Sequence, residues 1–232
     1  MIAPSAILFD KDGTLFDFKA TWGAWAQALM VRLAQGEHEH AARLGDAIGF
    51  DVVNAQFAPD SIAIAGTAAE VTEALRPHLP EMTRIEIQQV IDLEAARAPQ
   101  VEAVPLVPLL GGLRARGLRL GVATNDTEAP ARVHLEAAGI TGFFDFIAGF
   151  DSGHGAKPGP GQLLAFAHAC DLAPARIAMV GDSPHDLVAG RAAGMTCVAV
   201  LTGLTPRARL APLADVVLDD VSGLTGWLDS LG

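Results

Sequence analysis

The chain has 232 residues, of which half are hydrophobic and 19% are charged, and its formal net charge is −11. This composition excludes a disordered protein, and the length suits one large domain or two modest ones. The acidic excess argues against a nucleic-acid-binding surface, because clustered lysine and arginine bind phosphate backbones. A small anionic ligand stays possible, since a metal ion or one lysine can reverse the local field.

The sequence predicts neither a membrane protein nor a secreted one. No run reaches the roughly 18 apolar residues of a membrane span. The beginning, MIAPSAILFD, lacks the basic segment and the apolar length of a signal peptide. Cys170 and Cys197 are the only cysteines, too few for a disulfide framework and without the spacing of metal ligands. We therefore expect a cytoplasmic protein, and its oligomeric state, monomer or homodimer, stays open.

Short apolar runs alternate with helical patterns through most of the chain. Runs typical of buried strands occupy residues 5–10, 118–126, 176–183, 195–203 and 214–220. Helical patterns occupy 106–116, 127–138, 159–171, 184–193 and 221–230. Gly117, Gly139 and Gly194 stand where C-terminal caps are expected. The alternation predicts an α/β fold with a doubly wound parallel sheet, whose ligands bind beyond the carboxyl ends of the strands.

The alternation stops after the first strand. From about residue 18 to residue 98 only helical patterns occur, at 19–35, 37–48, 67–78 and 82–97. We expect an inserted helical cap domain at 18–98 and a core domain formed by 1–17 and 99–232. The stretch GLTPRARLAP (203–212) is expected to be a loop.

Residues suited to chemistry follow several of the predicted strands. They are Asp10 and Asp12 after the first strand, Thr124, Asn125 and Asp126 after the second, Lys157 in the loop GHGAKPGPG, and Asp182 and Asp186 in GDSPHD. If the sheet is parallel, these segments meet at one edge. Lysine occurs only three times against thirteen arginines, which makes a lysine in such a loop informative.

This set of side chains points to a metal ion and to phosphate. Several carboxylates cannot share a dry pocket without a cation, because each raises the pKa of the others. Oxygen ligands of this kind suit Mg²⁺, which keeps several waters and commonly acts on phosphate. One aspartate can attack phosphorus and form an acyl phosphate. Its neighbour two residues on can protonate the leaving oxygen and then activate water.

The same segments resemble a known family. DKDGT, TN after an apolar strand, KPGP and GDSPHD, in this order, look like the four motifs of the haloacid dehalogenase-like phosphohydrolases. The helical insertion is similar to the cap of the phosphoglycolate phosphatase-like branch. The resemblance covers nearly the whole chain, and the first motif is its most specific part.

The resemblance implies a role for each aspartate of the first motif. Asp10 would be the nucleophile and a ligand of Mg²⁺. Asp12 would be the general acid and base, with its main-chain carbonyl on the metal. Asp182 would complete the metal site. Family dehalogenases lack the second aspartate, so Asp12 favours phosphate over carbon–halogen chemistry.

The remaining motif residues would act on the phosphoryl group. By the same resemblance, Thr124 and Asn125 would hold it. Lys157 would neutralise charge on Asp10 and on the phosphate. Asp186 would support the metal site or Lys157 without contacting the substrate. Alternatively, its negative charge would only stabilise the positive end of the helix that it begins.

Aromatic residues at the start of the insertion bear on the substrate. Phe18 stands where chains of this branch often carry a small polar residue. This difference bears on the identity of the substrate but not on the type of reaction. Trp22 and Trp25, three residues apart, share one face of a helix. Core packing is the main expectation for both, and the alternative is that Trp22, with Lys19, faces the site from near the hinge.

Several further polar residues have structural explanations. Asp151 and Ser152 are expected to serve a turn or a helix cap. His38 and His40 do not share a helix face and are expected in a solvated helix start. His154 is expected to be a loop residue.

The predicted function is a magnesium-dependent phosphatase for a small phosphorylated metabolite, with phosphoglycolate as the first substrate. Two alternatives stay open: a phosphosugar mutase of the same branch, which returns the phosphoryl group to its product, and a non-catalytic ligand-sensing protein. The intact set of candidate catalytic residues argues against the second. No nucleic acid or membrane partner is expected.

Overall fold

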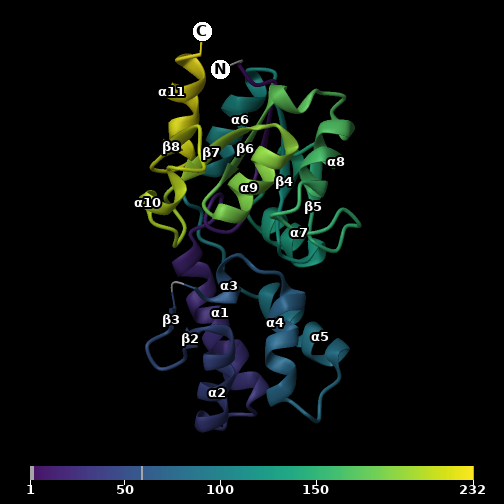
Figure 1. Cartoon of the computed structure of the whole chain (residues 1–232), viewed down its shortest axis with the longest axis vertical. Helices are drawn as coiled ribbons and strands as arrows, with labels where there is room; N and C mark the ends of the chain where they lie inside the picture. Colours follow the sequence, from purple (N-terminus) through teal and green to yellow (C-terminus); the bar gives the residue numbers. More distant parts are fainter. Residues whose placement is uncertain (1–2, 59, 232) are drawn as a thin grey trace.

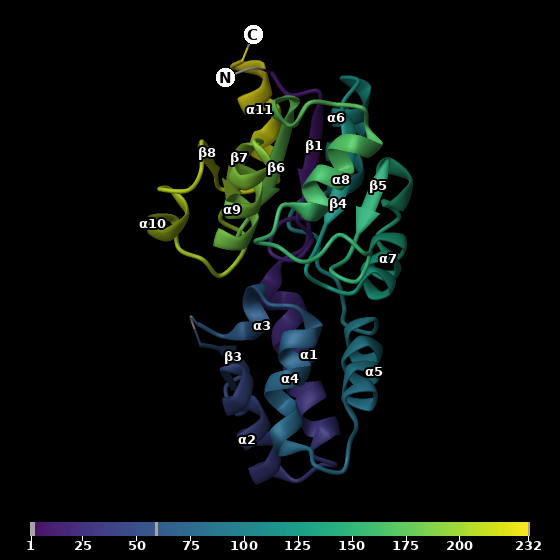
Figure 2. The ribbon, with the colours of Figure 1, turned by 45° about the vertical axis from the view of Figure 1, so that its right-hand side comes forward.

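The computed structural model describes residues 3–58 and 60–231. Figures 1 and 2 show an elongated molecule with two parts, an α/β part that contains the first and last described residues and a helical part at the opposite end. The chain enters the helical part after β1 (Ala6–Phe9) and returns before α6 (Leu106–Ala115).

Six strands form the sheet of the α/β part, in the order β5-β4-β1-β6-β7-β8. Besides β1 they are β4 (Arg119–Ala123), β5 (Phe146–Ala148), β6 (Ile177–Gly181), β7 (Thr196–Val200) and β8 (Val216–Leu218). Every pair of neighbours is parallel. The predicted α/β fold is confirmed, and β1 lies inside the sheet between β4 and β6.

Helices cover both faces of the sheet. On one face lie α6, α7 (Glu128–Ala137) and α11 (Leu224–Asp229), and on the other lie α8 (Gly161–Ala169) and α9 (Pro184–Ala193). Successive residues of β1 point to opposite faces. Ile7 and Phe9 belong to the first core, and Ala6 and Leu8 belong to the second. The buried run therefore has no polar position, and its first polar side chains come where the strand ends.

Two details of this part differ from the sequence prediction. Strand β5, three residues at one edge of the sheet, was not predicted. The expected loop at 203–212 contains one helical turn, α10 (Arg207–Leu210). Short 3₁₀ turns also occur at η2 (Thr141–Phe143), η3 (Pro174–Arg176) and η4 (Val221–Gly223). The predicted caps Gly117, Gly139 and Gly194 are confirmed, with φ of 80°, 68° and 78°.

The helical part has its own apolar core. Its elements are α1 (Phe18–Leu33), α2 (His38–Ile48), α3 (Ile62–Ala65), α4 (Ala68–Leu75), η1 (Arg76–His78) and α5 (Arg84–Ala95). Capping boxes begin two of the helices, Thr67 with Glu70 at α4 and Thr83 with Glu86 at α5. The core draws side chains from α1, α2, α4 and α5, including Leu29.

The prediction of helices alone in this part was wrong. Strands β2 (Phe50–Asp51) and β3 (Gln56–Phe57) form a small antiparallel hairpin. The Asp51 carboxylate accepts hydrogen bonds from the main-chain N–H groups of Val53 and Asn54, and this closes the turn. Two-residue strands carry no periodicity that a sequence pattern can show.

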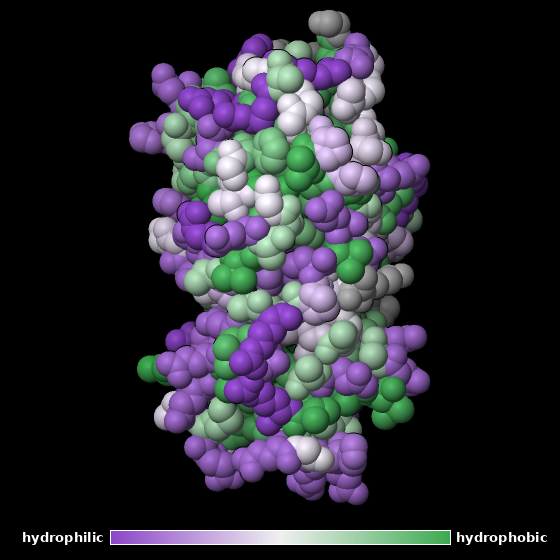
Figure 3. Space-filling view, turned by 180° about the vertical axis from the view of Figure 1, so that it is seen from behind, coloured by the Kyte–Doolittle hydropathy of each residue, from purple (hydrophilic) through white to green (hydrophobic). Residues whose placement is uncertain are grey.

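The surface offers no large apolar face in the view of Figure 3. Hydrophilic side chains are spread over both parts, with small hydrophobic groups between them. Within residues 3–58 and 60–231, no helix combines the length and the apolar character needed to cross a bilayer.

Candidate active site

The candidate site lies at the carboxyl ends of β1, β4 and β6, which are neighbours in the sheet. Asp10 continues β1, and its N–H donates to the Val180 carbonyl of β6 at 2.8 Å. Thr124 continues β4, and its N–H donates to the Ala148 carbonyl of β5 at 3.0 Å. Asp182 follows β6 directly. The sheet thus fixes the main chain of three candidate residues at one edge, as predicted.

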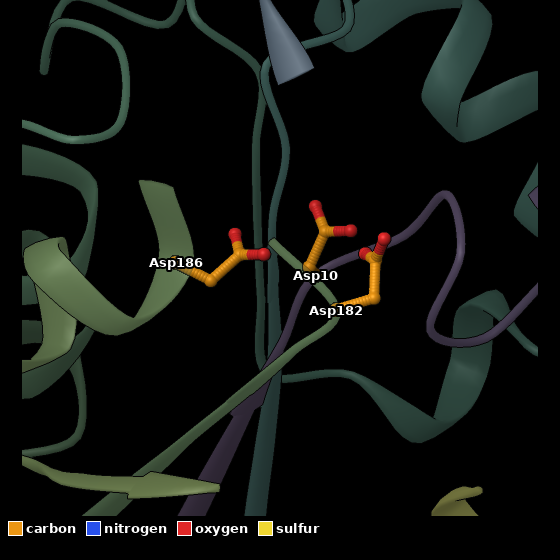
Figure 4. Close-up of side chains that lie close together, drawn as sticks. All are labelled: Asp10, Asp182 and Asp186. Atoms are coloured by element: carbon orange, nitrogen blue, oxygen red, sulfur yellow. The ribbon is translucent and has the colours of Figure 1, made fainter. Parts of the chain in front are cut away.

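Three buried carboxylates meet at this edge. One oxygen each of Asp10, Asp182 and Asp186 lies within 4.8 Å of the others. Figure 4 shows the Asp10 and Asp182 carboxylates side by side, with Asp186 pointing toward Asp10 from α9. Their exposed fractions are 7%, 3% and 1%. A cluster of this kind requires positive charge, because like charges in a dry site disfavour ionisation.

Lys157 supplies part of that charge. Its Nζ donates to Asp10 Oδ1 and to Asp186 Oδ1, both at 2.6 Å, and the residue is 4% exposed. Burial opposes the charged form, but the carboxylates of Asp10 and Asp186 raise the pKa of Lys157 above its ordinary value. The ammonium therefore stays charged and bridges two of the three carboxylates.

Asp186 reaches Lys157 because it belongs to a helix cap. Ser183 and Asp186 form the capping box of α9. Asp186 Oδ2 accepts from the Ser183 N–H at 3.0 Å and from the Ser183 hydroxyl at 2.7 Å. Because its two oxygens are engaged by the cap and by Lys157, Asp186 is placed to hold Lys157.

One lysine does not balance three carboxylates. Burial is the largest cause that raises the pKa of Asp10 to about 7; Lys157 opposes the rise, and Asp186 and Asp12 add to it. Burial, then Asp10 and Asp186, also raise the pKa of Asp182 well above its ordinary value. The residues fit a divalent cation, whose charge would keep both carboxylates ionised.

Asp182 is held between two glycines. A Cβ built on Gly13 or on Gly203 would overlap the Asp182 carboxylate, so both positions need the absence of a side chain. Gly13 also has a φ of 82°. The Thr14 hydroxyl lies 3.4 Å from Asp182 Oδ1, and the Thr202 hydroxyl donates to the Gly13 carbonyl at 2.5 Å. Sequence reasoning did not identify Gly203, because nothing near it in the chain marks it.

We expect Gly203→Ala to displace the Asp182 carboxylate. If the carboxylates hold a divalent cation, the added methyl group would weaken its binding on the order of 10- to 100-fold, as the loss of an orienting contact does at metal sites. Thermal-shift titration with Mg²⁺ measures this affinity. Gly226→Ala is the matched control, because a Cβ there meets no atom within 4 Å. Equal affinity in both variants would contradict the role given to Gly203.

The two residues after β4 differ in what their side chains do. Thr124 lines the cavity, and its Oγ1 accepts from the Asp126 N–H at 3.0 Å. Asn125 also lines the cavity, and its side chain forms a reciprocal pair with the main chain of Lys157: Nδ2 donates to the carbonyl and Oδ1 accepts from the N–H, both at 2.9 Å. Asn125 thus holds the Lys157 loop against the sheet.

Asp12 belongs to a second group of polar residues, in which sequence reasoning missed Lys11 and His134. Lys11 Nζ donates to Asp12 Oδ1 at 2.7 Å, pairs with Asp126 Oδ2 at 3.3 Å and lies 3.0 Å from His134 Nδ1. Lys11 is fully buried. The scarcity of lysine was the one signal that could have drawn attention to it.

The helical part forms the opposite wall of the cavity. Asp10, Asp12, Thr124, Lys157 and Asp182 line it from the α/β part, and Phe18, Trp22, Trp25, Val71 and Ile91 line it from the helical part. The indoles of Trp22 and Trp25 pack edge to face, with ring centroids 4.8 Å apart. The core packing expected for both tryptophans is confirmed, and both also line the cavity, as the alternative expected for Trp22. The Lys19 side chain lies outside the described side chains.

The polar residues with structural explanations lie away from this cavity. Asp151 Oδ1 accepts the Glu128 N–H at the start of α7, and the Ser152 hydroxyl accepts the Gly149 N–H. His38 is exposed, His40 pairs with the His78 carbonyl, and the exposed His154 lies against the Phe146 ring.

Known proteins resemble this chain along most of its length. The family model of haloacid dehalogenase-like hydrolases matches residues 4–194. A phosphoglycolate phosphatase of Rhodospirillum rubrum is 33% identical over 233 residues, covering 97% of this chain and 91% of the relative. A probable phosphatase, IndB, of Dickeya dadantii is 30% identical, covering 97% and 94%. The structure of CbbY from Rhodobacter sphaeroides in complex with phosphate matches with a TM-score of 0.73, 22% identity and coverage of 99% and 100%.

A parallel sheet with these four motifs at its carboxyl edge defines a hydrolase of the haloacid dehalogenase-like family, and the chain belongs to that family. Within the family it falls in the phosphoglycolate phosphatase-like branch and is a phosphoric monoester hydrolase.

Proposed function

We propose that the protein is a Mg²⁺-dependent phosphatase that acts on a small phosphorylated metabolite through an aspartyl-phosphate intermediate. One observation supports the proposal, namely the position of the Asp10 carboxylate at the end of β1. This carboxylate accepts a hydrogen bond from Lys157, lies beside Asp182 and lines a cavity. A nucleophile, a cation and a second carboxylate at that place suit attack on phosphorus.

In this proposal each residue has a chemical task. The Asp10 carboxylate attacks phosphorus, and the bond to the leaving oxygen breaks as Asp12 gives that oxygen a proton. Asp12 then takes a proton from the water that hydrolyses the acyl phosphate. Lys157 and the Thr124 hydroxyl offset charge on the phosphoryl oxygens.

The metal would be held by Asp10 and Asp182, with the main-chain carbonyl of Asp12 added on the family pattern. When bound, Mg²⁺ would neutralise charge on the phosphoryl group and orient it. The raised pKa values of Asp10 and Asp182 support this assignment, because both carboxylates lack sufficient positive charge without a cation.

We further propose that residues 18–98 act as a cap that closes over the site. The cap wall is largely apolar, with Phe18, Trp22 and Trp25 in it. Closure would exclude bulk water while Asp10 attacks, and a lid of this kind protects a reactive intermediate from side reactions.

Phosphoglycolate is the first substrate to test, since the relative in Rhodospirillum rubrum is a phosphoglycolate phosphatase. We place the protein in the cytoplasm, a location supported by two cysteines that are both free thiols.

The test is phosphate release from a panel of phosphorylated metabolites, with Mg²⁺ or with EDTA. The panel should include phosphoglycolate, sugar phosphates and nucleotides. We expect release from at least one small monoester, and we expect EDTA to abolish it. Release that EDTA leaves unchanged would contradict the metal assignment. Isomerisation that requires a sugar bisphosphate would identify a mutase instead, and binding without turnover would identify a sensor.

A further inference from the structure

We propose that Lys11 is a positioning residue for Asp12, and that Lys11 and His134 together connect Asp12 to the docked cap. The proposal rests on the proposed function, because it takes Asp12 as the general acid and base. It concerns the second group of polar residues, formed by the buried Lys11 and His134 and the half-buried Asp12 and Asp126.

The Lys11 ammonium has three acceptors around it. Asp12 Oδ1 lies at 2.7 Å, His134 Nδ1 at 3.0 Å and Asp126 Oδ2 at 3.3 Å. Of its three N–H donors, one donates to Asp12 and one lies against the His134 lone pair, while Asp126 adds an ion pair in which its Oδ2 accepts no hydrogen bond from the described residues. A fully buried lysine is costly unless it is paired, and the two carboxylates provide that pairing. Lys11 therefore holds the Asp12 carboxylate in one orientation at the edge of the cavity.

His134 extends the contact from Lys11 to the helical part. Its Nε2 lies 2.7 Å from the carbonyl oxygen of Ala95, the last residue of α5. A carbonyl oxygen only accepts, so Nε2 carries the hydrogen and Nδ1 offers its lone pair to Lys11. Burial, and then Lys11, lower the pKa of His134 to about 4, in agreement with a neutral ring.

The first cap helix meets the same ammonium. Lys11 Nζ lies 5.3 Å from the centroid of the Trp22 ring, within the range of a cation–π contact. The rings of Trp22 and His134 lie 6.3 Å apart, edge to face. The start of α1 and the end of α5 are the two ends of the helical part, and both therefore contact one lysine of the α/β part.

This arrangement has a consequence for the order of events. Movement of the cap away from the sheet would carry Ala95 and Trp22 away from His134 and Lys11, and would loosen the support of Asp12. The acid and base would then be fully ordered only when the cap is docked. Proton transfer would thus be tied to closure over a bound substrate.

The test is Lys11→Met, assayed with two kinds of phosphate ester. An alkyl phosphate needs a proton on its leaving oxygen, whereas p-nitrophenyl phosphate has a leaving group that departs without one. Because kcat/KM covers only the steps up to leaving-group departure, it isolates the acid role of Asp12. We expect kcat/KM for the alkyl ester to fall on the order of 100-fold, and for the aryl ester only a few-fold.

Variants of His134 test the link to the cap. His134→Leu should give the same leaving-group pattern with a smaller loss, on the order of 10-fold. His134→Gln should restore most of the activity, because its amide can donate to Ala95 and accept from Lys11. If Lys11→Met does not fold, the double variant Lys11→Met/Asp126→Asn takes its place in the assay. The double variant removes one of the two carboxylates together with the cation that pairs with them.

Equal losses on the two esters, or no loss on either, would overturn the proposal. Equal losses for His134→Leu and His134→Gln would overturn the link to the cap. The proposed function is tested separately, by Mg²⁺-dependent phosphate release from the wild-type protein. If the wild type releases phosphate and the variants give one of the outcomes above, only the role of Lys11 or His134 is wrong.

Discussion

Asp10→Asn is expected to abolish phosphate release, lowering kcat by about four orders of magnitude or more, as the removal of a nucleophile does in other covalent enzymes. The amide cannot form an acyl phosphate. Its oxygen can still accept a hydrogen bond from Lys157, so the fold should be retained. The measurement is phosphate release with the best substrate of the panel, together with a thermal melt of each protein.

The control for this prediction is Asp219→Asn, which makes the same chemical change at a side chain that is 90% exposed. Its activity should equal that of the wild type. Activity of Asp10→Asn within 10-fold of the wild type, in a folded protein, would exclude Asp10 as the nucleophile; the expected loss is about 1,000 times larger than that bound.

Lys157→Met is expected to lower both activity and stability. The loss of a cation that offsets phosphoryl charge should reduce kcat on the order of 1,000-fold. Breaking a buried pair leaves uncompensated carboxylates, which typically costs about 3–5 kcal/mol of unfolding free energy. Exposed ion pairs contribute far less, so Arg207→Met, which removes the surface pair with Asp219, is the matched control.

The stability loss in Lys157→Met should depend on pH. Asp10 already has a raised pKa in the wild type, so between pH 4 and about 7 the metal-free folded state binds more protons than the unfolded state. The contribution of Asp10 to the free energy of unfolding therefore falls as the pH rises. Without Lys157 the rise in pKa is larger, and the gap between variant and wild type should widen from pH 5 to pH 8. Melts without Mg²⁺ measure this gap, and a constant gap would contradict the account.

The sequence predicted the parts of the fold that depend on local pattern. The run SAILFD is apolar at every position that β1 buries, and its first polar side chain is Asp10. The carboxyl ends of parallel strands share an edge, so Asp10, Thr124 and Asp182 could be placed together before any distance was known. The hairpin of β2 and β3 could not be predicted, because its pairing is two residues long.

The parts of the site that depend on packing could not be predicted in the same way. His134 lies in the last turn of α7, and its contact with Lys11 joins residues 123 positions apart. Gly203 faces Asp182 across a loop. For Asn125 the family resemblance predicted phosphate binding, and the structure adds a pairing of its side chain with the main chain of Lys157. In each case the partner is fixed by the tertiary fold rather than by neighbours in the chain.

Asp186 shows how a local motif can serve the site. The sequence left open whether it supports Lys157 or simply begins a helix. The structure shows both, since one oxygen completes the capping box of α9 and the other accepts from Lys157. The helix cap fixes the position of the carboxylate, and the carboxylate fixes the position of the lysine.

The most direct test of the central claim is the stereochemical course of the reaction at phosphorus. The substrate is a monoester whose phosphoryl group is made chiral with sulfur and an oxygen isotope, hydrolysed in isotopically labelled water. Attack by Asp10 followed by attack of water comprises two in-line displacements, each of which inverts the configuration. The account therefore predicts net retention in the released thiophosphate. Net inversion would show that water attacks the substrate directly, and would contradict an aspartyl-phosphate intermediate.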